Sequence, residues 1–237
     1  MENIKGFILT SLVDWDGKVS AVIFLAGCNF RCPFCSNKDL VLPNSNLKSF
    51  SLEKIKENLE KNRDFIDGIV ITGGEPTLSK DLKTLCKELK DMGFKIKIDT
   101  NGSNPDLLKE LIKENLIDYA AMDVKSDKEN YDKASGVKVD LKKIEESIKT
   151  IINSGIDYEF RITLVPTLHN KKIVENIARW LSELEGNKNK IKKFVLQKFQ
   201  VKDDLLDKKF ENIKPFKDEE MQEFKEIAEK FVKAVLR

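Results

Sequence analysis

The chain has 237 residues, which at about 100–200 residues per domain predicts one domain, or one domain with a small appendage. It carries 42 Lys and Arg against 40 Asp and Glu, so its formal charge of +2 gives no strong field toward nucleic acid or an anionic membrane. Hydrophobic residues make up 41%, which excludes disorder for most of the chain. No apolar run approaches the roughly 18–20 residues that cross a bilayer, and the start shows no export signal. We therefore expect a cytoplasmic protein without nucleic-acid or membrane partners.

The first predicted element is a hairpin. Residues 7–13 and 18–24 flank Asp14-Trp15-Asp16-Gly17, and an Asp-Gly pair is a strong signal for a tight turn. The second arm overlaps the apolar run 20–26, which ends at Gly27. This run predicts a strand buried on both faces.

Short apolar runs then alternate with amphipathic patterns. Including the run above, the predicted strands are residues 20–26, 68–72, 95–99, 119–123, 158–165 and 193–196. The predicted helices are residues 51–61 behind a Ser51 cap, 79–92, 105–114, 140–154 before Gly155, and 171–184. Such alternation favours parallel α/β architecture, and an incomplete (β/α)6 barrel of TIM type fits the length best.

A final amphipathic pattern predicts a helix over residues 215–236, with Met221, Phe224 and Ala228 on its apolar face. We interpret that face as core packing rather than as a docking surface. The chain is thus expected to be a single domain, 1–237. It would comprise a lead-in (1–19), the partial barrel (20–200) and a helical extension (201–237).

Three of the four cysteines, Cys28, Cys32 and Cys35, fall within eight positions directly after the first core strand. A tight, odd-numbered group in a cytoplasmic chain indicates metal or redox chemistry rather than a disulfide framework. Three thiolates do not complete a structural zinc site, and the single histidine, His169, is far along the chain. A [4Fe-4S] cluster held by three cysteines would keep one iron open to a ligand. Cys86 lies on the apolar face of helix 79–92 and is predicted to be a core thiol.

The loop Cys-x3-Cys-x-aromatic-Cys, with Phe34 in the aromatic place, resembles the signature of the radical S-adenosylmethionine (SAM) superfamily. The resemblance implies a partial (β/α)6 barrel and a [4Fe-4S] cluster whose open iron is chelated by SAM. Reductive cleavage of SAM would then give methionine and a 5′-deoxyadenosyl radical. Gly73-Gly74-Glu75 resembles the superfamily's GGE motif, which meets the SAM amino group.

Polar residues follow the next strands. Asp99-Thr100-Asn101 closes one and Asp123 closes the next, so they should share the strand-end rim where barrels place their chemistry. Capping or turn formation is the alternative for each aspartate.

A closer resemblance covers nearly the whole chain. Thr10 to Lys18 resembles the lead-in of glycyl-radical-enzyme activating proteins, especially the activators of anaerobic ribonucleoside-triphosphate reductase, with pyruvate formate-lyase activating enzyme more distant. Cys35-Ser36-Asn37 resembles that group's Cys-His-Asn, with Ser36 substituted. The partners implied are a large glycyl-radical enzyme as substrate and a flavodoxin- or ferredoxin-type electron donor.

By motif position, this resemblance implies SAM contacts for residues of the loops and strand ends, and it allows a monovalent cation beside them. They are Phe34, Asn37, Gly73, Gly74, Glu75, Asp99, Thr100, Asn101, Asp123, Lys125, Arg161, Thr163 and Gln200. Gln200 stands where the formate-lyase activator has histidine; it can hydrogen-bond but does not titrate near neutrality. For Arg161 a surface ion pair is the plain alternative. No acid or base of the protein is expected to be catalytic, because the cofactors carry the chemistry.

Two other functions stay open. A small-molecule radical SAM enzyme, such as a 7-carboxy-7-deazaguanine synthase, would share the cysteine loop and the barrel. An iron-sulfur electron carrier would need Cys86 or an outside residue as fourth ligand. The oxygen sensitivity of an open cluster predicts an anaerobic setting for either enzyme.

Overall fold

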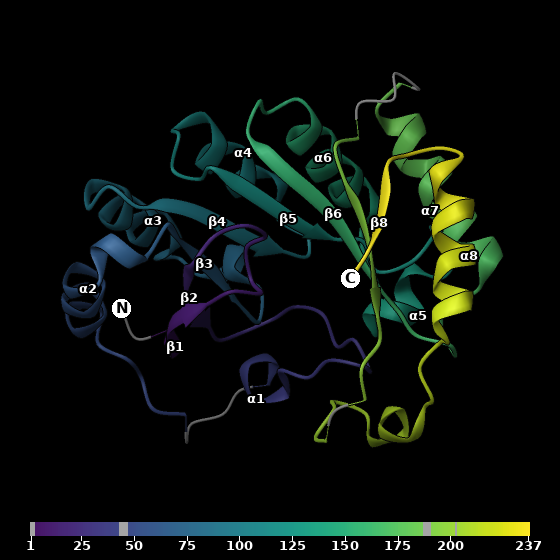
Figure 1. The fold of residues 1–237 in the computed structure, drawn as a ribbon, viewed down its shortest axis with the longest axis horizontal. Coiled ribbons are helices and arrows are strands. Elements are labelled where there is room, and N and C mark those ends of the chain that lie inside the picture. Colours follow the sequence, from purple (N-terminus) through teal and green to yellow (C-terminus); the bar gives the residue numbers. More distant parts are fainter. Residues whose placement is uncertain (1–2, 43–46, 187–190, 202) are drawn as a thin grey trace. The chain divides into compact units, whose positions relative to one another are not determined.

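The computed structural model describes residues 3–42, 47–186, 191–201 and 203–237 (Figure 1). Residues 1 and 2 of the predicted lead-in and residue 202 of the predicted extension lie outside the described residues. Two compact units are distinguished. Unit 1 comprises Met1–Asn29, Asp39–Thr100 and Asp106–Ala120, and unit 2 comprises Phe30–Lys38, Asn101–Pro105 and Ala121–Arg237. The single-domain boundaries stay a prediction.

Strands and helices alternate along the chain as expected. The strands are β1 (Ile4–Ser11), β2 (Ser20–Leu25), β3 (Gly68–Gly73), β4 (Lys95–Thr100), β5 (Tyr119–Asp123), β6 (Asp157–Leu164), β7 (Phe194–Lys198) and β8 (Ala234–Leu236). The helices are α1 (Lys38–Val41), α2 (Leu52–Lys61), α3 (Leu82–Asp91), α4 (Pro105–Lys113), α5 (Tyr131–Ser135), α6 (Leu141–Ile152), α7 (Lys171–Leu184) and α8 (Asp218–Glu229). Three short 3-10 helices are Arg63–Phe65, Pro76–Leu78 and Lys208–Asn212. Sheet order follows chain order from β1 to β8, which confirms the mostly parallel α/β class.

In unit 1, β1 pairs antiparallel with β2 and confirms the predicted hairpin, whose turn is closed by a hydrogen bond from the Lys18 amide to the Trp15 carbonyl. Strands β2, β3 and β4 are parallel, with Ile23 opposite Ile71 and Ile71 opposite Ile98. Ser51 caps α2, its hydroxyl accepting from the Lys54 amide, as predicted. Because these strands are parallel, their carboxyl ends meet at one edge of the unit.

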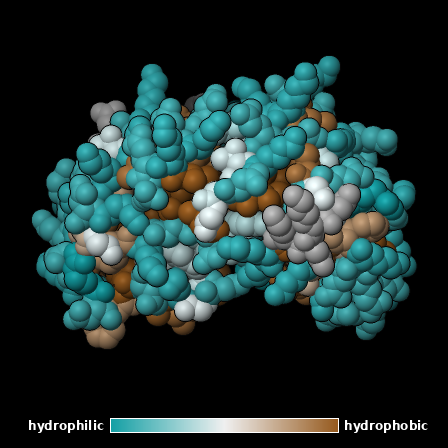
Figure 2. Space-filling model, turned by 90° about the horizontal axis from the view of Figure 1, so that it is seen from above, coloured by the Kyte–Doolittle hydropathy of each residue, from teal (hydrophilic) through white to brown (hydrophobic). Residues whose placement is uncertain are grey.

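In unit 2, β6, β7 and β8 form a parallel sheet, and α7 and α8 pack side by side (Figure 1). The buried residues Met221, Phe224 and Ala228 of α8 confirm that its apolar face is core. Most of the face in Figure 2 is hydrophilic, with hydrophobic residues visible between polar side chains. None of the helices within the described residues combines the length and hydropathy that crossing a bilayer requires.

The predicted helix 215–236 is wrong at its end, because α8 stops at Glu229 and residues 234–236 form β8. Strand β7 supplies the reason. Its open edge offers backbone partners, so the Phe194 amide donates to the Lys233 carbonyl and the Arg237 amide donates to the Leu196 carbonyl, at 2.9 and 3.0 Å. Val232 and Val235 are three positions apart, as on one face of a helix, but Val235 lies in β8.

Candidate cofactor site

The glycine pair after β3 is packed directly on the backbone of β2. The Gly74 amide donates to the Leu25 carbonyl at 2.8 Å, and the Glu75 amide donates to the Gly27 carbonyl at 2.7 Å. A Cβ on Gly74 would lie 2.2 Å from the Gly27 oxygen, and Gly73 also has a φ of 123°. Only glycine fits here. The pair thus fixes the segment that leads into Cys28.

Glu75 lies in a hydroxyl-lined position that is 1% exposed. Its Oε1 accepts from the Thr77 amide at 3.0 Å, from the Thr77 hydroxyl at 2.5 Å and from the Thr100 hydroxyl at 2.7 Å. Three donors on one oxygen hold the carboxylate in a single orientation and join the ends of β3 and β4.

Asp99, one residue before Thr100, is a partly buried carboxylate at the same end of β4. Its Oδ1 lies 3.1 Å from the Lys97 ammonium, and the Asp99 side chain is 13% exposed. Asp99 therefore does not cap a helix; it lies inside β4 and forms an ion pair with Lys97 of the same strand.

The cysteine loop is divided between the units: Cys28 belongs to unit 1, and Cys32 and Cys35 belong to unit 2. All four cysteines are described, and none forms a disulfide. Cys32 is 8% exposed, and the Cys35 amide donates to its carbonyl at 3.0 Å, which makes a tight turn. Within the described ranges, no three His, Cys, Asp or Glu side chains gather around one point as metal ligands do.

One side of this loop in unit 2 rests on the turn after α5. The Arg31 amide donates to the Ser135 carbonyl at 2.7 Å. A Cβ on Gly136 would lie 2.0 Å from the Arg31 oxygen, and Gly136 has a φ of 71°. The loop and the turn therefore meet backbone against backbone.

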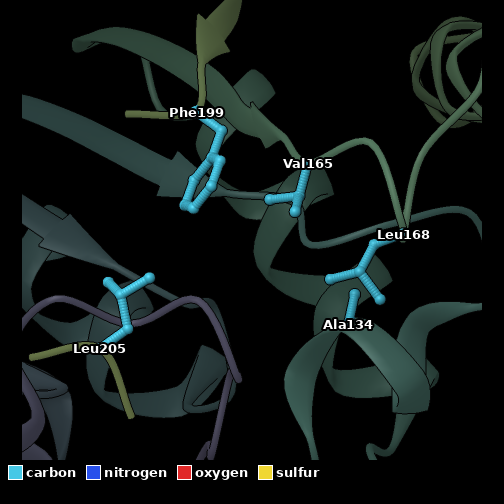
Figure 3. Packing of buried hydrophobic residues seen from close by; sticks show 5 residues of the cluster. All are labelled: Ala134, Val165, Leu168, Phe199 and Leu205. Carbon is cyan, nitrogen blue, oxygen red and sulfur yellow. The ribbon is translucent and has the colours of Figure 1, made fainter. Parts of the chain in front are cut away.

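The other side is held by the segment after β7. The Leu206 amide donates to the Cys35 carbonyl and the Asp207 amide to the Pro33 carbonyl, both at 3.0 Å. Phe34 packs against an apolar cluster formed by Ala134, Val165, Leu168, Phe199 and Leu205. Figure 3 shows Phe199, Val165, Leu168 and Ala134 gathered on one side and Leu205 on the other. The predicted extension therefore anchors the cysteine loop.

Asp123, Arg161 and Lys125 form a charged group at the ends of β5 and β6. Arg161 Nε lies 2.9 Å from Asp123 Oδ1, and Lys125 Nζ lies 3.0 Å from Asp123 Oδ2. Burial alone would raise the pKa of Asp123, but the two cations hold it well below its ordinary value. Burial would lower the pKa of Lys125, yet Asp123 and Cys32 raise it above its ordinary value, so this ammonium lies near the cysteine loop. Arg161 is 11% exposed, which excludes the surface ion pair.

His169 supports the Lys125 segment through two hydrogen bonds of its ring. Its Nδ1 accepts from the Val165 amide at 2.9 Å, so the neutral ring carries its proton on Nε2, which donates to the Lys125 carbonyl at 2.9 Å. Burial lowers the pKa of His169 to about 4. The imidazole is therefore neutral at physiological pH and ties the Lys125 segment to the end of β6.

A second buried carboxylate, Glu159, lies on the same face of β6 as Arg161. It is 2% exposed and accepts two bonds from the Arg237 guanidinium at 3.0 and 3.1 Å. Lys193 Nζ lies 3.1 Å away and Arg161 Nη1 3.9 Å away. This charge network joins β6, β7 and the residue after β8.

For the other predicted SAM-contact residues the structure gives mainly their burial and their place in the chain. Thr163 is half-buried on the Arg161 face of β6, and Asn101 is buried, its Oδ1 accepting from the Ser103 amide. Asn37 and Gln200 are exposed, and Gln200 lies two residues beyond β7. The contacts of these four residues with SAM stay a prediction.

Four residues of this site were missed from the sequence: Lys97, Gly136, Glu159 and His169. In the sequence, Lys97 and Glu159 occupy the polar positions of an alternating pattern, which is typical of a solvent-facing side of a strand. Both are buried because both faces of their strands are covered. Gly136 carries the one readable signal, because a glycine after a short helix marks a left-handed cap. The prediction for Cys86 is confirmed: it is fully buried in α3, and burial raises its pKa to about 12.

Comparison with known proteins agrees with these features. A protein of Methanocaldococcus jannaschii that is named as a glycyl-radical enzyme activating enzyme, MJ1227, is 34% identical to this chain. The alignment of 238 positions, gaps included, covers 98% of this chain and 94% of the relative. A 7-carboxy-7-deazaguanine synthase of a Synechocystis species is 34% identical over 91 residues, 38% of this chain and 42% of its own. A domain of pyruvate-formate lyase-activating enzyme from Bacteroides vulgatus has the same fold, with a TM-score of 0.58 at 19% identity over 72% of this chain and 98% of that domain.

A sequence model of the radical SAM superfamily matches residues 22–181, which include the cysteine loop, the glycine pair and the ends of β4, β5 and β6. The match covers more than half of the chain, and the fold is the partial α/β barrel that the resemblance implied. The chain belongs to the radical SAM superfamily.

Proposed function

We propose that this chain is a glycyl-radical-enzyme activating oxidoreductase. As a radical SAM enzyme it uses a [4Fe-4S] cluster and SAM. The observation that carries the proposal is the 34% identity to a protein named as such an activating enzyme, which extends over 98% of this chain. The pyruvate formate-lyase activating fold is consistent with it.

Cys28, Cys32 and Cys35 would hold the cluster. The donor set fits, because soft thiolates suit iron-sulfur clusters and three of them spare one iron for SAM. Two features of unit 2 favour the bound form of the loop: the Cys32–Cys35 turn presents two sulfurs close in sequence, and the cationic Lys125 lies near Cys32. The backbone anchors at Arg31, Pro33 and Cys35 keep this arrangement rigid.

We propose SAM contacts within each unit by itself. In unit 1, Gly74 and Glu75 would meet the SAM amino group, since a fixed carboxylate suits an ammonium, and Asp99 and Thr100 would lie by the ribose. In unit 2, Lys125 and Arg161 supply two cations against the single carboxylate of Asp123, which leaves positive charge for the SAM carboxylate. Phe34, Asn37, Asn101, Thr163 and Gln200 would complete the lining.

The cluster, held by Cys28, Cys32 and Cys35, would supply the electron that cleaves SAM to methionine and a 5′-deoxyadenosyl radical, with a flavodoxin- or ferredoxin-type protein as the donor. Transfer of a hydrogen atom from a glycine Cα of the partner would give 5′-deoxyadenosine and a glycyl radical. We propose anaerobic ribonucleoside-triphosphate reductase as the partner, on the resemblance of Thr10 to Lys18.

The test is anaerobic incubation of the reconstituted protein with SAM, a reductant and a candidate partner, followed by electron paramagnetic resonance. We expect the doublet of a glycyl radical on the partner. Cys32→Ala should abolish both the cluster absorbance and the doublet. Cys86→Ala is the matched control and should retain both, because this thiol is fully buried on the apolar face of α3.

The rival function, conversion of a small molecule, predicts a different result. Two deazaguanine synthases, of Synechocystis and Thermococcus kodakarensis, match 38% and 72% of this chain, against 98% for the relative named as an activating enzyme. SAM cleavage without any glycyl radical on the reductase, combined with turnover of a deazaguanine precursor, would reject the activating function. Loss of the cluster in Cys86→Ala would instead support an electron carrier.

A further inference from the structure

Lys97 is a buried ammonium inside unit 1. Its side chain is 3% exposed, and it stands in the middle of β4, two residues before Asp99. Burial of a charged amine is unfavourable unless partners replace its lost water. A methionine would fill the same space without that cost, so the charge itself calls for an explanation.

Three groups around the ammonium replace that water. Nζ donates to the backbone carbonyl of Asp14 in the hairpin turn. It lies 3.1 Å from Asp99 Oδ1 and 5.8 Å from the ring centroid of Tyr119. The ammonium therefore donates a hydrogen bond to the Asp14 carbonyl, forms an ion pair with the Asp99 carboxylate and lies within cation–π range of the Tyr119 ring.

The surroundings keep this ammonium in place. The Trp15 ring is 6% exposed and lies 5.7 Å from the Tyr119 ring, and it packs in one cluster with Val22 and Val70. Gly68 lets the Trp15 ring approach, since a Cβ there would lie 2.6 Å from it. The turn that carries Asp14 is therefore packed into the unit, and Lys97 connects it to Asp99.

The family resemblance allows a monovalent cation beside the predicted SAM-contact residues, which include one aspartate in each unit, Asp99 and Asp123. Asp99 already has the Lys97 ammonium as a counter-ion. In unit 2, both oxygens of Asp123 are already engaged, one by Arg161 and one by Lys125. An added metal ion would have to displace cations that belong to the chain, so the residues present do not fit an inorganic cation.

We infer that Lys97 is a positioning residue whose ammonium is the resident counter-ion of Asp99, so that SAM binding needs no sodium or potassium ion. The inference rests on the proposed function, which places Asp99 by the ribose of SAM. Lys97 holds the Asp99 carboxylate in one orientation and anchors it to the hairpin through Asp14. It does not itself contact SAM or the reacting atoms.

The test measures SAM binding to the anaerobically reconstituted holoenzyme by calorimetry, with tetramethylammonium as the sole added cation or with added potassium or sodium chloride. For the native chain we expect dissociation constants that agree within about twofold in all three salts. Lys97→Met should weaken binding about tenfold in tetramethylammonium, which corresponds to about 1.4 kcal/mol. Potassium or sodium should restore part of the loss, because a small cation can then enter beside Asp99.

The matched control is Lys95→Met, which removes an exposed lysine from the same strand and should leave binding unchanged. Lys97→Arg, which keeps the charge, should bind better than Lys97→Met in tetramethylammonium. Recovery by potassium separates a missing counter-ion from general damage, which salt does not reverse. If Lys97→Met does not fold, sodium-23 nuclear magnetic resonance on the native holoenzyme tests the inference instead. The sodium line should have the same width with and without SAM. A line that the protein broadens, and that SAM broadens further, would overturn the inference.

The outcomes separate this inference from the proposed function. A native chain that binds SAM only with added potassium or sodium contradicts the role of Lys97 and leaves the radical SAM chemistry intact. The same holds if Lys97→Met binds SAM as tightly as the native chain in tetramethylammonium. A holoenzyme that binds no SAM in any salt contradicts the proposed function instead.

Discussion

The two units hold their predicted SAM-contact residues by different interactions. In unit 1, the end of β3 is fixed by backbone packing, with Gly74 against Gly27 and the Glu75 carboxylate held by hydroxyl and amide donors. In unit 2, the ends of β5 and β6 are fixed by charges, with Asp123 between Arg161 and Lys125 and Glu159 beside Arg237. The first arrangement depends on shape, and the second depends on protonation and ion pairing.

The SAM contacts proposed for the two units differ in the same way. SAM presents an ammonium and a carboxylate together, and an ion pair with spare positive charge can rearrange to accept the carboxylate. A backbone contact that leaves no room for a Cβ cannot rearrange, so it provides a fixed reference for the loop that begins at Cys28. We therefore expect substitutions in unit 1 to act through steric conflict and those in unit 2 through electrostatics.

The largest effect is expected for Gly74→Ala. Its Cβ would lie 2.2 Å from the Gly27 carbonyl oxygen, which is itself backbone and cannot turn away. We expect a loss of about 4 kcal/mol or more of unfolding free energy, at the upper end of what single substitutions cause. Thermal denaturation followed by circular dichroism measures it.

Gly17→Ala is the matched control within unit 1. Gly17 has a left-handed φ, 72°, which Gly74 lacks, and a Cβ at Gly17 would have nothing within 4 Å, so only backbone strain of about 1 kcal/mol is expected. Equal losses for the two variants would mean that the close approach at Gly74 costs no more than backbone strain.

An intermediate effect is expected for Arg161→Met. The substitution leaves Asp123 with Lys125 as its remaining cation in this group, and breaking a buried ion pair by removing one partner costs about 3–5 kcal/mol. Asp123 is 31% exposed, so water reduces the loss to about 3 kcal/mol. Urea denaturation measures this value.

The double variant Arg161→Met with Asp123→Asn sharpens the comparison, because it removes the stranded charge together with its partner. Its stability should lie above that of Arg161→Met alone. Stability below that of the single variant would show that β5 and β6 are held by shape, as in unit 1, and would remove the contrast between the units.

The sequence predicts the elements of this fold well and the contacts of the site only in part. Periodic apolar residues locate the strands β2 to β7 and the long helices, although not β8, because burial on a regular backbone leaves a regular pattern. The same alternation places Lys97 and Glu159 among polar positions, although both are buried. Their charge is stabilised by partners far along the chain, Asp14 for Lys97 and Arg237 for Glu159. Contacts between distant segments leave no local pattern, and the end of α8 at Glu229 was mispredicted for the same reason.

The smallest effect is a pH dependence from His169, the single histidine of the chain. Its folded-state pKa of about 4 lies below the ordinary value of 6.5, so the unfolded chain binds more protons between these two values. Stability contributed by the neutral ring is complete above pH 6.5 and is lost as the pH falls toward 4. At pH 5.0 the loss relative to pH 7.5 should be about 2 kcal/mol, by the linkage relation.

His169→Gln should remove most of this dependence, because Gln does not titrate in this range and can still donate to the Lys125 carbonyl. Hydrogen exchange supplies the local measurement that distinguishes the units. The Val165 amide, which donates to His169 Nδ1, should lose protection between pH 7.5 and 5.0 once intrinsic rates are divided out. The Gly74 amide, which donates to the Leu25 carbonyl, should keep its protection, since no titrating side chain takes part in that bond. Equal loss of protection at both amides would mean that acid destabilises unit 1 as much as unit 2. The contrast between strand ends fixed by backbone packing and strand ends fixed by charges would then not hold.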